Sequence, residues 1–311
     1  MKLYSNILKL FQFLVTKSKI YFSFKINSLL FVIQISKYKN ISKFTNLFKS
    51  IYVTKSNYFR SRNIKMKSKK FRLIVSNKNN AKINMATDEA LALSYEQNDT
   101  PILRLYHWEK SFTLGIGQKV EEYSNRLEYK EYNNNYAKRI TGGGVLFHGH
   151  DLSYSLILSP LDVGGLSVKE SYEKICSFLL NFYKKLGLNA KYVKDDNSLT
   201  LSKSQFCQVG FEAYDIVIDG KKIGGNAQRR TKNFIFQHGS IPLEKITTYL
   251  QNKNEVGNSL PDFGVNISYE KAHDLLTKAF EETFSIDLKN TQLTQKEEAK
   301  LAQLLKEKYD I

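Results

Sequence analysis

Cysteine is scarce in this sequence of 311 residues, which contains only Cys176 and Cys207. Two cysteines do not make the disulfide framework of a small secreted domain, and a reducing compartment is the default for such a chain. They also do not supply the ligand pattern of a structural zinc site. The sequence therefore gives no support for a fold held by disulfides or zinc, and each thiol has to be assessed separately.

Acidic residues are absent from residues 1–70, which carry sixteen of the 47 Lys and Arg residues. The same segment lacks Gly, Ala and Pro. The formal net charge of +17 would by itself favour nucleic acid or an acidic membrane as a partner. The rest of the chain, however, holds 31 basic and 30 acidic residues, a balance of +1. The basic bias belongs to the N-terminal segment alone, so we expect no nucleic acid partner for the folded part.

Long apolar runs are missing as well. The longest in the N-terminal segment, LLFVIQI at 29–35, falls well short of the ~20 residues that cross a bilayer, so no membrane partner is expected. Neither a secretory signal nor a typical mitochondrial presequence is recognisable. We expect residues 1–65 to be an extension outside the fold, translated upstream sequence or a dispensable segment, with a transit peptide as the alternative. The location is then cytoplasmic, or organellar in the second case.

Residues 66–311 are expected to form one α+β domain, because short strand-like runs alternate with helical patterns. The pattern at 84–98 indicates a helix with acidic residues near its start, which suits the helix dipole. A further helix ends at Gly187 and places Cys176 on its apolar stripe, as a core residue. The C-terminal third is expected to be helical. Strands are expected at 71–76, 102–108, 111–117, 151–159 and 233–241.

Two local signals fix ends of these elements. Asp219 and Gly220 stand between two β-like runs, and this pair is the strongest short signal for a tight hairpin. Thr294 and Glu297 have the spacing of a capping box, which predicts the start of a last helix.

A glycine run, Thr141-Gly142-Gly143-Gly144, is the first candidate site. Glycines allow backbone N–H groups to approach an anion, but the run lacks the Gly-Lys-Ser/Thr ending of a phosphate loop and the GxGxxG spacing before a helix. It fits equally a place where a ligand chain lies against bare backbone, or a flexible loop. These alternatives stay open from the spacing alone.

Two histidines and an aspartate follow this run. His148, His150 and Asp151 could form a metal site, but residues in a turn leading into a strand alternate sides, and no further ligand cluster is visible in the sequence. No metal is therefore expected. His148 is either a polar residue of a pocket wall or a structural histidine with satisfied hydrogen bonds.

Cys207 differs from Cys176 because it stands where a polar loop enters a strand. A partly exposed thiol becomes a nucleophile when a cation stabilises its thiolate, although a lone loop cysteine is usually inert. The candidate cation is Lys222, on the arm of the hairpin that leads into Gly224 and Gly225, whereas Lys221 is typical of a solvated surface lysine.

Four ordered motifs resemble the superfamily of lipoate–protein ligases, octanoyltransferases and biotin–protein ligases. The motifs are RITGGGVLFH (139–148), HDLSYS (150–155), GKKIGGNAQRR (220–230) and QHGSIPL (237–243). The resemblance covers the chain from Lys70 to its C-terminus. It implies the catalytic fold of these ligases, which is similar to that of class II aminoacyl-tRNA synthetases: a mixed, mostly antiparallel sheet flanked by helices. Matching the motifs residue by residue implies that substrate is bound by Arg139, Thr141, Gly142, Gly143, Gly144, His148, Gly224, Gly225, Asn226, Ala227, His238 and Gly239.

Cys207 favours one branch of this superfamily. It precedes Tyr214 by seven residues and Lys222 by fifteen, which is similar to the cysteine-dependent octanoyltransferases. The resemblance implies that Cys207 takes an octanoyl group from octanoyl-acyl carrier protein and passes it to a lysine of a lipoyl domain or of the glycine-cleavage H protein, with Lys222 as the second catalytic residue. Backbone N–H groups near Gly142 to Gly144, or at Gly225, would stabilise the oxyanion.

Departures from the motifs leave alternatives. Asn226 stands where serine is commoner, and Gly144 is a ligase-like choice where some transferases have arginine. Two alternatives remain open: an ATP-dependent lipoate–protein ligase, which would need ATP and magnesium, and an amidotransferase that moves octanoyl or lipoyl groups between lipoyl domains. The transferase needs no cofactor.

Overall fold

The computed structural model describes residues 20–26, 29–35, 66–124, 132, 134–202, 207, 210–246 and 257–310. The chain forms two compact units, Met1–Asn63 and Ile64–Ile311. In the first unit, β1 (Ile20–Ile26) and β2 (Leu29–Ile35) pair as an antiparallel hairpin, so the apolar run LLFVIQI is a strand. Within the described ranges, no helix has both the length and the apolar character to cross a membrane.

A six-stranded mixed sheet forms the centre of the second unit, in the order β12-β13-β8-β4-β3-β14. The three pairings from β12 to β4 are antiparallel, while β4-β3 and β3-β14 are parallel. The predicted α+β fold with a mixed, mostly antiparallel sheet is confirmed. The strands are β3 (Lys70–Asn79), β4 (Ile102–Trp108), β8 (Asp151–Leu158), β12 (Asn226–Arg230), β13 (Ile235–Pro242) and β14 (Asp287–Asn290).

Two three-stranded sheets lie beside the main sheet. One joins β6 (Tyr136–Lys138), β5 (Ser111–Leu114) and β7 (Leu146–His148), and the other joins β11 (Lys221–Gly224), β10 (Ile216–Ile218) and β9 (Lys191–Tyr192). The tight hairpin at Asp219 and Gly220 is confirmed, because both residues have positive φ, 48° and 74°, as a type I′ turn requires. β5 ends at Leu114, three residues before the predicted end.

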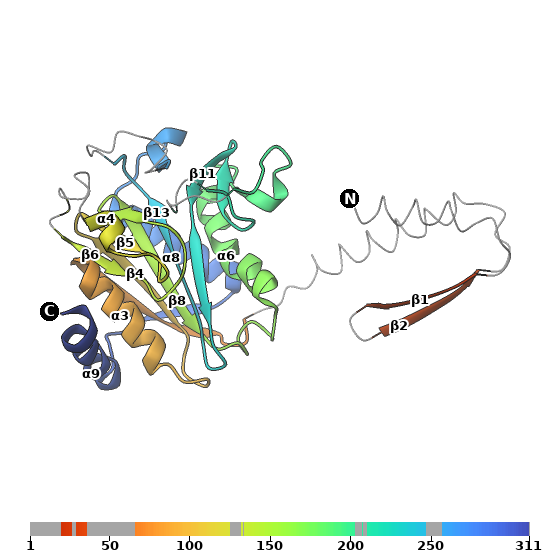
Figure 1. The fold of residues 1–311 in the computed structure, drawn as a ribbon, viewed down its shortest axis with the longest axis horizontal. Helices are drawn as coiled ribbons and strands as arrows, with labels where there is room; N and C mark the ends of the chain where they lie inside the picture. Colours follow the sequence, from red (N-terminus) through yellow and green to blue (C-terminus); the bar gives the residue numbers. More distant parts are fainter. Residues whose placement is uncertain are drawn as a thin grey trace. The chain divides into compact units, whose positions relative to one another are not determined.

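Helices cover both faces of the main sheet (Figure 1). α6 (Val168–Lys185) packs against α8 (Tyr269–Phe284), and together with the sheet they enclose the largest core cluster, which includes Tyr154, Phe178 and Phe280. α3 (Ala81–Ser94) packs against α9 (Gln295–Leu304), on the opposite face. Shorter elements are α4 (Glu121–Ser124), η1 (Val193–Asp195), η2 (Leu260–Phe263) and η3 (Leu305–Tyr309).

Cys176 belongs to α6 and lies in the largest core cluster, as its position on the apolar stripe predicts. Its side chain is fully buried, and the amide of Gln237 donates to its sulfur at 3.2 Å. Burial raises the pKa of the Cys176 thiol to about 12. This thiol therefore stays protonated at neutral pH and does not act as a nucleophile.

The helix predicted at 84–98 is α3, which begins at Ala81 and ends at Ser94. Asn80 caps α3 by accepting a hydrogen bond from the backbone N–H of Ile83, and the first turn contains no acidic residue. The predicted interaction of acidic residues with the helix dipole is therefore wrong. Asp88 lies in the middle of the helix, is buried, and pairs with Arg104 at 2.7 Å. Burial by itself would raise the pKa of Asp88, but the charge of Arg104 holds it below the usual range.

The C-terminal third is not wholly helical. α8 is followed by β14, a short polar strand that extends the sheet by pairing in parallel with β3. The predicted capping box of the last helix is confirmed, because Thr294 accepts from the N–H of Glu297 and Glu297 accepts from the N–H of Thr294.

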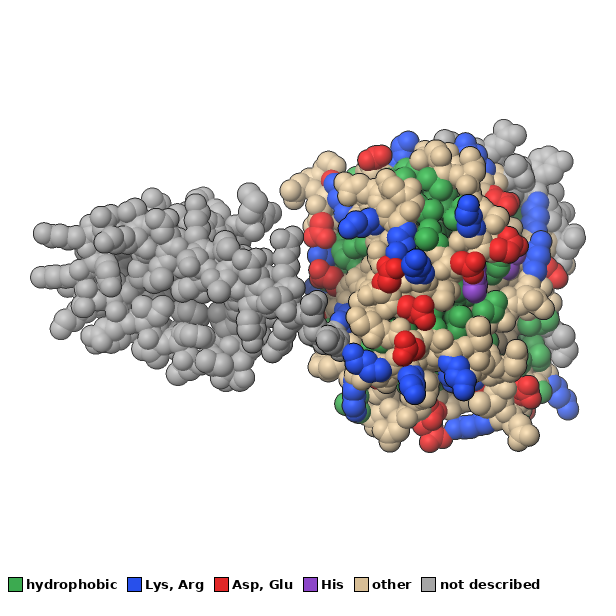
Figure 2. All heavy atoms as spheres, turned by 180° about the vertical axis from the view of Figure 1, so that it is seen from behind, with side chains coloured by type: hydrophobic (Ala, Val, Ile, Leu, Met, Phe, Trp, Pro, Cys, Tyr) green, Lys and Arg blue, Asp and Glu red, His purple; other side chains and the backbone are tan. Residues whose placement is uncertain are grey.

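Charged side chains of both signs are mixed on the molecular face drawn in Figure 2. There, Lys and Arg side chains of the described residues lie among Asp and Glu side chains, with apolar groups between them. This distribution agrees with the near balance of charge that the sequence has after residue 70.

Candidate active site

A cavity forms where the first small sheet, α3 and the start of β12 meet. Its volume is about 30 Å³. It brings together eight residues that the sequence motifs predicted, from segments far apart in the chain: Arg139, His148, Cys207, Gly225, Asn226, Ala227, His238 and Gly239. Six further residues line it that sequence reasoning missed: Met85, Tyr106, Trp108, Thr113, Leu146 and Ser153.

The remaining predicted residues are not part of this lining. Thr141 Oγ1 and His238 Nε2 are 2.7 Å apart, which ties the glycine run to β13. Gly224 lies where β11 approaches β13, because a Cβ there would come within 2.9 Å of the carbonyl oxygen of Ser240. Thr141 and Gly224 therefore hold the wall in place without lining it.

Arg139 is the cation at the centre of the site. Its guanidinium is buried, and it donates to Thr113 Oγ1 at 2.8 Å and to the carbonyl oxygen of Gly144 at 2.6 Å. Burial lowers the pKa of Arg139, and the neighbouring Cys207 acts in the opposite direction. An arginine stays protonated in proteins, so the charge remains at neutral pH. Arg139 therefore fixes the conformation of the glycine run and brings a positive charge to the site.

Gly143 separates this cation from the thiol. Its φ is +102°, and a Cβ added to it would lie 3.1 Å from Cys207 Sγ and 3.2 Å from Arg139 Nη2. The backbone N–H of Cys207 donates to the carbonyl oxygen of Val145 at 2.9 Å, just after the run. A Cβ on Gly115 would overlap the carbonyl group of Gly143, so the backbones of these two residues approach closely. The glycine run is thus packed against Cys207 by its bare backbone.

Lys222 contacts the backbone of Cys207 and not its thiol. The ammonium is buried and donates to three acceptors: Asp215 Oδ2 at 2.6 Å, the carbonyl oxygen of Cys207 at 2.6 Å and that of Gly210 at 2.7 Å. An ammonium has three N–H groups, so each of them has an acceptor. In this arrangement Lys222 fixes the segment that carries the thiol.

Asp215 is the partner of Lys222 that sequence reasoning missed. Burial raises the pKa of Asp215, while the charge of Lys222 counteracts part of this effect. The two residues are paired at 2.6 Å, and both side chains are at most 6% exposed. Asp215 precedes β10 and Lys222 lies in β11, so the hairpin could have indicated that they are neighbours, but not that both are buried.

His148 fulfils both of the roles considered for it. It lines the cavity and stacks on Trp108, with ring centroids 3.8 Å apart. Its nitrogens are 2.9 Å from Thr113 Oγ1 and 2.9 Å from Asp151 Oδ2. Burial raises the pKa of Asp151, but the interaction with His148 outweighs this and holds it below the usual range. Among the residues that the structure describes, no three His, Cys, Asp or Glu side chains are arranged to hold a metal ion.

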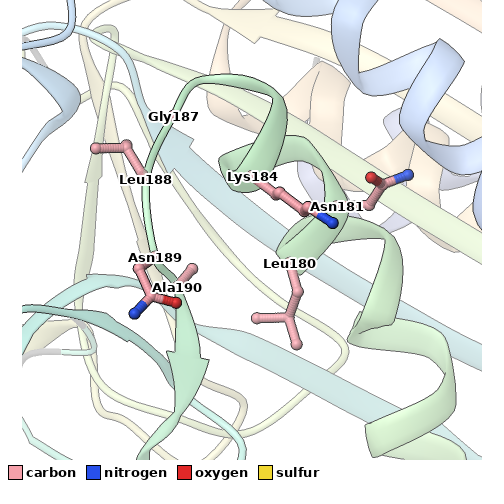
Figure 3. Close-up of a pocket in the computed structure, with 7 residues that line it drawn as sticks. All are labelled: Leu180, Asn181, Lys184, Gly187, Leu188, Asn189 and Ala190. Atoms are coloured by element: carbon pink, nitrogen blue, oxygen red, sulfur yellow. The ribbon is translucent and has the colours of Figure 1, made fainter.

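A second hollow lies at the C-terminal end of α6 (Figure 3). It is lined by the last turns of the helix and the loop to β9, including Asn181, Lys184 and Gly187. Asn181 is already engaged, because its amide donates to Thr283 Oγ1 and to the carbonyl oxygen of Ala279. None of its seven lining residues is Cys, His, Asp or Glu, so this hollow offers no nucleophile with a base beside it.

Comparison with known protein families matches residues 80–256 to the lipoyl protein ligase A/B catalytic domain. Among curated proteins, the octanoyltransferase LipM of Anoxybacillus flavithermus is 30% identical over 272 residues, which cover 79% of this chain and 97% of the relative. The protein of the same name from Halalkalibacterium halodurans is 31% identical, with 77% of this chain and 96% of the relative covered. The resemblance inferred from the four motifs is confirmed.

Solved structures agree with the fold. A putative lipoate protein ligase from Thermoplasma acidophilum with bound lipoic acid matches with a TM-score of 0.64 and 27% identity, over 78% of this chain and 97% of the other. A lipoate-protein ligase A bound with ATP matches with a TM-score of 0.65 and 26% identity, over 78% and 96%. With a matching domain model over more than half of its residues, the chain belongs to the lipoyl protein ligase A/B catalytic domain family.

Proposed function

We propose that this protein is a cysteine-dependent octanoyltransferase of protein lipoylation. It takes the octanoyl group of octanoyl-acyl carrier protein onto Cys207 and transfers it to a lysine of a lipoyl domain or of the glycine-cleavage H protein. The observation that carries the proposal is the position of Cys207, whose thiol lies in the cavity beside Arg139 across Gly143. The curated relatives named octanoyltransferase LipM support the same reaction.

The first half-reaction is the attack of the Cys207 thiolate on the carbonyl carbon of the donor thioester. A new carbon–sulfur bond forms, the bond to the carrier sulfur breaks, and the carrier leaves as a thiolate that takes up a proton. The positive charge of Arg139 stabilises the Cys207 thiolate, as a neighbouring cation does for reactive cysteines. Met85, Trp108 and Leu146 give the cavity an apolar wall for the acyl chain.

In the second half-reaction, the amine of the acceptor lysine attacks the Cys207 thioester. The amine loses a proton, an amide forms, and the Cys207 thiolate is released for another cycle. A thioester is converted to an amide, which runs downhill without ATP. Lys222 positions the segment of Cys207 in this scheme through the carbonyl oxygen of Cys207 and the pair with Asp215.

The test is intact-protein mass spectrometry of the full chain after incubation with octanoyl-acyl carrier protein in the absence of ATP. We expect an octanoyl adduct that hydroxylamine removes and that is absent from Cys207→Ala. The matched control is Cys176→Ala, since Cys176 is the other free thiol and lies in the core; this variant should still form the adduct.

An ATP-dependent lipoate–protein ligase is the rival, because one of the similar solved structures is such a protein bound with ATP. A ligase passes its acyl group through an adenylate and does not need Cys207. Absence of the adduct, together with ATP-dependent modification of a lipoyl domain by Cys207→Ala, would overturn the proposal. An amidotransferase uses the cysteine but accepts an octanoylated lipoyl domain as donor, so replacing the carrier by such a domain in the assay distinguishes it.

A further inference from the structure

Asn226 carries a buried hydrogen-bond donor with no partner. The residue lines the cavity that contains Cys207, and its Oδ1 accepts a hydrogen bond from the hydroxyl of Tyr154 at 2.6 Å. Its Nδ2 is buried and finds no acceptor among the residues that the structure describes. An unpaired buried donor is costly, so a donor kept unpaired at a cavity wall indicates an acceptor on the ligand.

A chain of hydrogen bonds ends at the Asn226 amide. Gln228 Nε2 donates to Gln237 Oε1 at 2.9 Å, Gln237 Nε2 donates to the Tyr154 hydroxyl at 3.1 Å, and Tyr154 donates to Asn226 Oδ1. The Tyr154 hydroxyl accepts from Gln237 and donates its single proton to Asn226 Oδ1. In this arrangement the NH₂ group of Asn226 is left unpaired.

The register of the sheet makes this chain possible. Asn226 in β12, Gly239 in β13 and Tyr154 in β8 are aligned across three adjacent strands. Gly239 has no side chain, and the Tyr154 hydroxyl reaches Asn226 over it. A Cβ on Gly239 would overlap Asn226 Oδ1 and lie 2.7 Å from Tyr154 Cε1. The space above Gly239 is thus required for the contact that orients Asn226.

We propose that Asn226 Nδ2 donates a hydrogen bond to the carbonyl oxygen of the acyl thioester. This oxygen gains negative charge when the Cys207 sulfur bonds to the carbonyl carbon, and it loses the charge when the carrier thiolate leaves. A donor fixed beforehand stabilises that charge without reorganisation. Tyr154, Gln237 and Gly239 are positioning residues for Asn226. The inference rests on the proposed function.

The experiment compares two reactions of Cys207 in the full chain. Acylation by octanoyl-acyl carrier protein develops charge on a carbonyl oxygen, whereas alkylation by iodoacetamide displaces iodide and develops none. Asn226→Ala and Asn226→Leu both remove the donor, and they leave the site with different volumes. We expect both variants to lose about 10²–10³-fold in the acylation rate constant, as enzymes do when an oxyanion donor is removed. Their alkylation rates should stay within about twofold of the wild type.

Tyr154→Phe tests the orientation of the amide, because it keeps Asn226 and removes the hydroxyl that anchors Oδ1. We expect slower acylation with unchanged alkylation, and a smaller loss than in Asn226→Ala. Unchanged acylation in both Asn226 variants would overturn the inference about Asn226 and leave the proposed function intact. An equal decrease of the acylation and alkylation rates would have the same meaning. A wild-type chain that is alkylated but never acylated would instead overturn the proposed function, and the inference with it.

Discussion

Arg139 and Cys207 lie against the same glycine. A Cβ on Gly143 would be 3.2 Å from Arg139 Nη2 and 3.1 Å from Cys207 Sγ, so the guanidinium and the thiol are neighbours that only a residue without a side chain can separate. Lys222, which the sequence indicated as the cation for the thiol, instead donates to the carbonyl oxygen of Cys207. The two basic residues thus have different contacts: Arg139 lies beside the thiol, and Lys222 binds the backbone of the segment that carries it.

The first prediction concerns Arg139→Gln, which removes the cation beside the thiol. The thiolate loses its stabilisation, so we expect alkylation of Cys207 by iodoacetamide at pH 7 to slow by about tenfold or more. Arg229→Gln is the matched control, because Arg229 is exposed and its guanidinium donates to the carbonyl oxygen of Ile140, at 3.4 Å. Equal alkylation rates in Arg139→Gln and Arg229→Gln would show that Arg139 has no influence on the thiol.

The second prediction compares neighbouring glycines. Gly143→Ala places a methyl group between Sγ and the guanidinium at a φ of +102°, which side chains rarely adopt. We expect a loss of stability of about 1–3 kcal/mol and a strong loss of Cys207 acylation. Gly142→Ala is the control, because a Cβ there meets nothing within 4 Å. Thermal unfolding measures the loss of stability, and the acylation rate measures the effect on Cys207. Similar values for Gly143→Ala and Gly142→Ala would contradict the close packing of Gly143 against Cys207 and Arg139.

The sequence predicted most elements of the fold because their signals are local. The β-like run ILRLYHW predicted β4 correctly, and the pair Asp219-Gly220 predicted the β10–β11 turn. The strand β14 was missed because its sequence, DLKN, is short and polar and only one of its residues is more than slightly buried. Its membership in the sheet comes from pairing with β3, more than two hundred residues earlier, and no local pattern reports such a contact.

The site was only partly predictable, for a similar reason. Conspicuous sequence, such as Cys207 and the segment around Gly225, named eight of the residues that line the cavity, and six others were missed. Asp88 is a buried partner of Arg104, yet in the sequence it is indistinguishable from an acidic residue that faces solvent on a helix. The role expected for Lys222 assumed a contact with the thiol, and this depended on the register between the hairpin and the Cys207 segment, which the sequence does not encode locally.

The third prediction concerns the buried pair of Lys222 and Asp215. Lys222→Met leaves the Asp215 carboxylate and two carbonyl oxygens without their donor, so we expect a loss of about 3–5 kcal/mol in the free energy of unfolding, together with slow acylation of Cys207. The control is Lys221→Met, since Lys221 is exposed and should change stability by less than about 0.5 kcal/mol.

A double-mutant cycle measures the interaction energy between Lys222 and Asp215. Asp215→Asn should destabilise the wild type more than it destabilises Lys222→Met, because the carboxylate has already lost its partner there. The free energies of unfolding of the four chains, measured with urea, give this difference. Additive losses would mean that the contact at 2.6 Å contributes no coupling energy.

The last prediction concerns the pH dependence of stability and follows from His150. This residue precedes Asp151, the carboxylate that contacts His148. Burial is the main cause that lowers the pKa of His150 to about 4, from an ordinary value of 6.5. The unfolded chain therefore binds a proton at His150 as the pH falls below about 6.5, while the folded chain does so only near 4. Because the unfolded state binds more protons in that window, the contribution of His150 to stability is complete above pH 6.5 and is lost as the pH falls towards 4.

His150→Gln removes this titration. Between pH 8 and pH 4.5, urea unfolding of the wild type should show a decrease in stability that exceeds the decrease in His150→Gln by roughly 1–3 kcal/mol. Part of the decrease should remain in the variant, because burial also lowers the pKa of His107 and of His238. If both chains lost stability equally, His150 would have to take up its proton in the folded protein near its ordinary pKa, which requires that solvent reaches the side chain.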